Sequence, residues 1–123
     1  MGRLLVRTVT AFICALLIGC LVHARPALAD TTATSTVTQM TVISKSNKKY
    51  PLYHGAIWLA HDEARTNYRW GGNHCGGKEL SEAKVGMLFA AFRARYSVNI
   101  DFASNLYKGK RYRCITGFTV RRS

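Results

Sequence analysis

The chain has 123 residues, of which 18 are lysine or arginine and six are acidic, giving a formal net charge of +12. This length predicts one domain and excludes a large hydrophobic core. The positive charge favours anionic partners such as phosphate polymers, acidic glycans, lipopolysaccharide or anionic lipids. The alternative is a solvated cationic surface that binds no such partner.

Residues 1–29 follow the order of a secretory signal peptide. Arg3 and Arg7 precede an uncharged apolar run at residues 8–22, and residues 27–29 (ALA) place small side chains where a signal peptidase cleaves. A rival interpretation is a lipoprotein box that puts a lipid on Cys20, but the apolar run continues past that cysteine. A retained transmembrane helix would need about 20 apolar residues. We therefore expect a secreted or periplasmic protein that starts at residue 30.

Cleavage there leaves Cys75 and Cys114 as the two cysteines of the mature chain and lowers the net charge from +12 to +9, because three arginines are removed. Export to an oxidising compartment predicts a Cys75–Cys114 disulfide. Such a bridge closes a loop of about 40 residues, which is worth roughly 4 kcal/mol in the chain-entropy model. Neither cysteine has a C-x-x-C partner, which disfavours the alternative of a metal or redox site.

Three short strands are expected in the first half of the mature chain. A small polar tail at residues 30–36 precedes strands at residues 37–43, 52–60 and 67–70, which are separated by polar loops. The glycines at positions 71, 72, 76 and 77 then predict a flexible loop around Cys75.

One helix is expected, at residues 81–96. Ser81 is its predicted N-cap, and an apolar stripe at helical spacing predicts burial of Val85, Leu88, Phe89 and Phe92. A strictly alternating strand at residues 97–102, a turn at residues 103–110 and a last strand at residues 111–120 complete the chain, with Gly117 marking a bend or bulge.

The order β-β-β-α-β-β predicts an α+β, mostly β domain over residues 37–123. One helix between the third and fourth of five short strands is the order of the OB-fold, a small and partly open barrel. An OB-like barrel is therefore the predicted architecture. An open antiparallel sheet with one helix packed on it is the competing arrangement.

Residues 75–120 carry a family resemblance. A cysteine precedes the helix sequence VGMLFAAFRARY, the strand SVNIDF follows at once, and the final strand YRCITGFTV carries the second cysteine. This run resembles secreted bacterial toxin B subunits of the subtilase-cytotoxin and pertussis-like type, and small exported OB-fold proteins related to them. The resemblance implies an OB-fold, assembly of copies into a ring, glycan binding on host cells and a catalytic A-type partner chain. No position matches their sugar-binding residues, so it transfers no binding site.

Tyr68, Arg69 and Trp70 form the predicted ligand-binding site. Aromatic faces stack on sugar rings or bases, and arginine pairs with carboxylates or phosphates. The alternative is that Tyr68 and Trp70 lie in the core, with Arg69 exposed. The basic residues of the C-terminal hairpin form either one patch or a solvated face; they are Lys108, Lys110, Arg111, Arg113, Arg121 and Arg122.

Catalysis and cofactors are not expected. His54, His61 and His74 would suit a small secreted nuclease that uses one histidine as base and another as acid, but spacing alone cannot place them together, and the sequence has no signature for the reaction. His74 and Cys75 are too few ligands for zinc, and the glycine-rich loop lacks the Lys-Ser/Thr of a P-loop. The sequence thus predicts a binding module for a glycan or another anionic surface. The alternative is an OB domain that binds single-stranded nucleic acid or anionic polymers.

Overall fold

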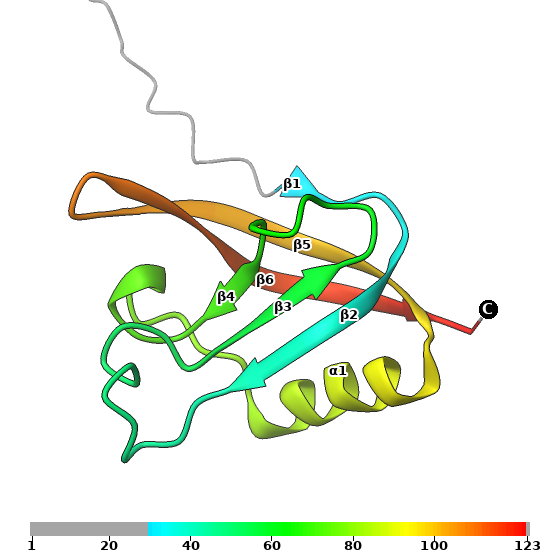
Figure 1. Ribbon diagram of the computed structural model, residues 1–123, viewed down its shortest axis with the longest axis horizontal. Coiled ribbons are helices and arrows are strands. Elements are labelled where there is room, and N and C mark those ends of the chain that lie inside the picture. Colours follow the sequence, from blue (N-terminus) through cyan, green and yellow to red (C-terminus); the bar gives the residue numbers. More distant parts are fainter. Residues whose placement is uncertain (1–29, 123) are drawn as a thin grey trace, which may run out of the picture.

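The computed structural model describes residues 30–122, and the predicted signal peptide at residues 1–29 lies outside this range (Figure 1). The described elements in chain order are β1 (Asp30–Thr31), β2 (Ser35–Val42), β3 (Gly55–Leu59), β4 (Tyr68–Trp70), the 3₁₀ turn η1 (Asn73–Cys75), α1 (Glu82–Ala94), β5 (Ser97–Tyr107) and β6 (Lys110–Arg121). The predicted α+β, mostly β class is confirmed. Within residues 30–122 no helix is both long and apolar enough to span a membrane.

The strands form one sheet in the order β1-β5-β2-β3-β4-β6, and β5 also pairs with β6. Following the pairings from β5 through β2, β3, β4 and β6 therefore leads back to β5. All pairs are antiparallel except β4 with β6, which run in the same direction because α1 and β5 intervene in the sequence. Six strands are present instead of the predicted five, since the two-residue β1 adds to the edge of β5.

The segment 30–36, predicted as a tail without regular structure, instead contains β1 and the start of β2. The hydroxyl of buried Thr32 accepts a hydrogen bond from the Ile100 backbone N–H at 2.9 Å. Hydrogen bonds from hydroxyl and amide groups, and not buried apolar side chains, hold this segment to β5. The sequence therefore lacks the apolar alternation by which a strand is predicted.

Helix α1 begins as predicted, with the Ser81 hydroxyl accepting from the Lys84 backbone N–H at 3.3 Å. Leu88 is fully buried and Ala91 is 1% exposed, whereas Phe89 is 49% exposed. The predicted burial of Phe89 is therefore wrong. Phe89 lies one position, or about 100°, around the helix from Leu88, which turns it away from the centre of the buried face.

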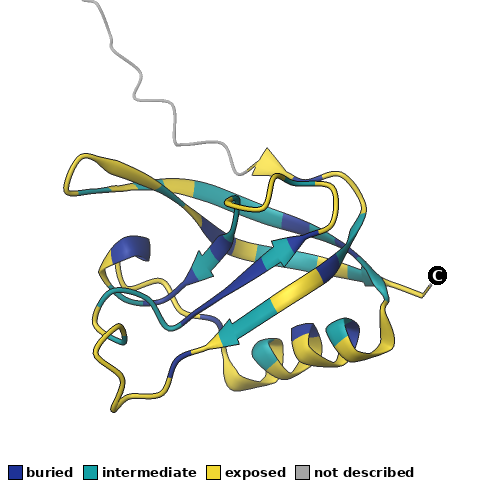
Figure 2. Cartoon of the chain, in the orientation of Figure 1, coloured by how far each residue is buried: buried dark blue, intermediate teal, exposed yellow. Residues whose placement is uncertain are grey.

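The β5–β6 hairpin is longer than predicted. β5 continues to Tyr107 and turns through Lys108 and Gly109, which both have positive φ. Its tip extends beyond the other strands and is largely exposed (Figure 1 and Figure 2). The register of the hairpin slips between Ile115 and Gly117, at the bend that Gly117 predicts. The hairpin tip therefore carries Lys108, Lys110 and Arg111 beyond the packed core, whereas Arg121 lies at the other end of β6, paired with Ser97.

Candidate functional site

The Cys75–Cys114 disulfide organises the region where β4, η1 and β6 meet. The two cysteines are joined as predicted, with Cα atoms 5.5 Å apart. The preceding loop is held by a hydrogen bond from the His74 backbone N–H to the Leu52 carbonyl at 2.8 Å. Gly72 permits this approach, because its φ is +66° and a Cβ there would lie 2.5 Å from the Leu52 oxygen. The glycine-rich loop thus forms a defined turn that places His74 beside β6.

Two of the three predicted ligand-binding residues belong to the core. Tyr68 is 3% exposed and Trp70 is 2% exposed, and the Trp70 indole packs directly against Gly55. The burial of both rings favours the alternative, in which Tyr68 and Trp70 are core residues. Arg69, between them on β4, lies on the opposite face of the strand and is half-buried.

Arg69 is held in a layered cluster that the sequence does not reveal. Its guanidinium carbon lies 4.3 Å from the Tyr53 ring centroid and 4.8 Å from the Tyr112 ring centroid. The His74 ring is nearly parallel to both phenol rings, at interplanar angles of 10° and 6°. Two parallel phenol rings cannot share one face of a guanidinium at these distances. Tyr53 and Tyr112 therefore flank the Arg69–His74 pair.

Hydrogen bonds fix the position of the Arg69 side chain within this cluster. Its Nε donates to Asn67 Oδ1 at 2.9 Å, and its Nη1 donates to His74 Nδ1 at 2.5 Å. Because a guanidinium only donates, Nδ1 of His74 must accept and the imidazole is neutral. Burial lowers the pKa of His74, and the nearby charges of Arg69 and Lys110 lower it further. Arg69 is thus the fixed cation of the cluster.

A pocket of about 350 Å³ opens beside this cluster. Five of its lining residues are cationic, four are polar and uncharged, and none is acidic: they are Arg65, Arg69, Lys110, Arg111 and Arg113, with Thr66, Asn67, Ser104 and Tyr112. The parallel pairing of β4 with β6 brings the loop before β4 next to the start of β6. We call this cavity the basic pocket.

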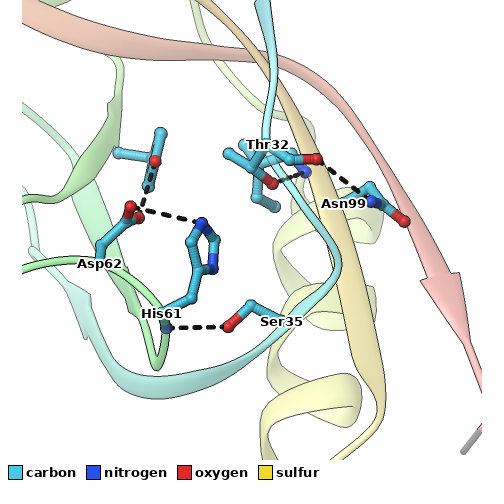
Figure 3. Close-up of polar contacts among 7 residues, drawn as sticks. Thr32, Ser35, His61, Asp62 and Asn99 are labelled. Atoms are coloured by element: carbon cyan, nitrogen blue, oxygen red, sulfur yellow. Dashed lines mark hydrogen bonds and ion pairs between the residues drawn. The ribbon is translucent and has the colours of Figure 1, made fainter.

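A second polar cluster anchors the loop that leads to the basic pocket. Asp62 Oδ2 accepts from the Tyr68 hydroxyl at 2.7 Å, and Oδ1 lies 3.4 Å from His61 Nε2 (Figure 3). Burial, then the hydrogen bond to Asp62, raises the pKa of Tyr68, so its phenol stays protonated and donates. The His61 backbone N–H donates to the Ser35 hydroxyl at 3.1 Å. This cluster joins residues 61–62 to β2 and β4.

The three histidines belong to separate sets of contacts. His54 stacks on Tyr50 and pairs with Glu79, His61 contacts Asp62, and His74 lies in the Arg69 cluster. Among the described residues there is no group of three or more His, Cys, Asp or Glu side chains placed to hold a metal ion. The structure therefore assigns no shared histidine site.

The sequence singled out part of the basic pocket and missed the rest. Arg69 and the hairpin residues Lys110, Arg111 and Arg113 were candidates, whereas Arg65 and Thr66 were not. Arg65 and Thr66 lie in a polar loop without periodicity, and the β4–β6 pairing brings that loop to the hairpin.

Comparison with protein-family models, with curated proteins and with solved structures found no match to this chain. The functional argument therefore depends on the geometry and charge of the basic pocket.

Proposed function

We propose that the protein is a secreted or periplasmic binding module that recognises an anionic glycan surface through the basic pocket. The observation that carries this proposal is the pocket's lining, in which five cationic residues meet no acidic one. A concave site with cations and neutral hydrogen-bond donors suits a ligand that carries both acidic groups and hydroxyls.

The scaffold we propose is an OB-like barrel. Its support is the closed circuit of pairings through β5, β2, β3, β4 and β6, in which α1 lies in the chain between β4 and β5. OB-folds bind oligosaccharides and oligonucleotides on a sheet face and the adjoining loops. The resemblance to toxin B subunits favours sugar as the ligand. It extends the proposal to a ring of copies and a catalytic partner chain.

The proposed role is binding without catalysis. The nine residues that line the basic pocket include no histidine and no carboxylate, the groups that most often act as general acids or bases. His74 lies next to the pocket but is 6% exposed, and its Nδ1 already accepts from Arg69. Arginine and lysine in this setting attract and orient anions.

Glycan-array binding tests this proposal, with Arg111→Gln and Lys84→Gln as matched variants. Both residues are exposed and both changes remove one positive charge, but only Arg111 lines the basic pocket. The purified protein should bind acidic glycans in preference to neutral ones. Arg111→Gln should weaken that binding about tenfold, equivalent to about 1.4 kcal/mol, while Lys84→Gln should not.

Two results would contradict the proposal. One is a parent protein that binds no acidic glycan at low ionic strength. The other is an equal loss for both variants, which would mean that net charge, and not the pocket, drives adsorption.

A further inference from the structure

The basic pocket holds more positive charge than a single acidic group would neutralise. Five cationic residues surround a cavity of about 350 Å³. Like charges that line one cavity repel one another. A carboxylate brings one negative charge to a sugar unit. A chain bearing sulfate or phosphate esters brings several charges over the same length. The charge density of the pocket therefore favours esters of tetrahedral oxyanions.

The donor geometry fits the oxygens of such esters. Four of the five cationic residues are arginines, whose planar forks bind phosphate as well as carboxylate oxygens in pairs. Arg69 is preorganised, because Tyr53 and Tyr112 flank its guanidinium and Asn67 and His74 each accept one of its N–H groups. A donor fixed before binding loses little side-chain entropy when the ligand arrives. The remaining N–H groups of Arg69 are free of hydrogen bonds to protein atoms among the described residues.

The aromatic residues around the pocket favour a sugar chain over single-stranded nucleic acid. Nucleic-acid binding by such domains uses open ring faces on which bases stack. Here His74 covers one face of Tyr112 at a centroid distance of 3.9 Å, and the Lys110 ammonium lies 5.6 Å from the same ring. Tyr53 packs on Arg69. The neutral lining groups of Thr66, Asn67 and Ser104 instead suit the hydroxyls of a sugar.

We infer that the ligand of the basic pocket is a glycan bearing sulfate or phosphate esters, and not one whose only acidic groups are carboxylates. This inference rests on the proposed function and names the chemistry of its ligand. Arg69 acts as the fixed fork for one ester group, and Lys110, Arg111 and Arg113 supply the surrounding charge.

The test compares ligands that share a backbone. A heparin octasaccharide is measured against the same octasaccharide after complete desulfation and N-acetylation, which leaves its carboxylates, by isothermal titration calorimetry at several salt concentrations. A phosphorylated mannan oligosaccharide and an oligo-dT of equal charge complete the set. We expect the sulfated or the phosphorylated glycan to bind at least tenfold more tightly than the desulfated one. Tighter binding of heparin or of the mannan identifies the ester.

Variants connect this preference to the pocket. Arg111→Gln should lower the slope of log affinity against log salt by about one, because one ionic contact is lost. Lys84→Gln, the control on α1, should leave the slope unchanged. Arg69→Lys keeps the charge but removes the fork, so it should weaken ester binding about tenfold with little change in slope. Thermal melting confirms that each variant is folded. If Arg69→Lys does not fold, the salt slope of Arg111→Gln tests whether the basic pocket binds the ester.

The outcomes separate this inference from the proposed function. Equal affinity for the sulfated and desulfated octasaccharides, with loss in Arg111→Gln, would overturn the ester preference and leave acidic-glycan binding in place. Tighter binding of oligo-dT than of either esterified glycan would overturn the inference in favour of nucleic acid. Binding to none of the glycans would overturn both proposals.

Discussion

Replacement of Leu88 by alanine should destabilise the protein far more than replacement of its neighbour Phe89, although phenylalanine is the larger residue. Leu88 is fully buried against the sheet, whereas Phe89 is 49% exposed. Removing a buried leucine side chain costs about 3–4 kcal/mol, since the transfer free energy is lost and a cavity remains. About half of the Phe89 ring is already in water, so its removal should cost about 1 kcal/mol. That figure includes its contact with Arg93, whose guanidinium carbon lies 5.8 Å from the ring centroid.

Equilibrium unfolding in urea measures both losses. A chain of this size has a total stability of roughly 5–14 kcal/mol, so Leu88→Ala removes a large part of it. Its melting temperature should fall by roughly 12–30 °C, and that of Phe89→Ala by less than about 8 °C. Equal losses, or a larger loss for Phe89→Ala, would refute the packing of α1 described here. The m-values of the two variants should match that of the parent, because a changed m-value would mean an altered unfolded state.

Three further results are expected. Unreduced, denatured protein should show no free thiol at Cys75 or Cys114, and reduction should lower the free energy of unfolding by about 4 kcal/mol; two reactive thiols would contradict the bridge. The pKa of His74 is lowered on folding, so the unfolded state takes up its proton first and stability should fall as the pH drops below about 6.5, the unfolded value. His74→Gln should flatten this fall, and parallel curves for parent and variant would disprove the assignment. Gly55→Ala should lower the free energy of unfolding, measured in urea, by about 1–3 kcal/mol, since its Cβ would lie 2.0 Å from the Trp70 ring. Unchanged stability would mean that this contact is absent.

Local patterns predicted most of the elements. The alternation after residue 96, the N-cap at Ser81 and the apolar stripe each act over a few residues, and β5 and α1 form where those patterns lie. The pairing of Cys75 with Cys114 also followed, because the other two cysteines lie within the predicted signal peptide. The polar segment at residues 30–36 was missed, since its hydrogen bonds are made to a strand about 65 residues away.

The sequence by itself determined the mostly β class, the single helix, the disulfide and the excess of positive charge. It did not determine where that charge is concentrated. The parallel pairing of β4 with β6 joins the loop at residues 65–67 to the start of the hairpin, about 45 residues further along the chain. The stacking of Arg69 between Tyr53 and Tyr112 likewise unites three distant segments. Composition and periodicity describe neighbours along the chain, whereas a pocket is made by neighbours in space, which only the tertiary structure decides.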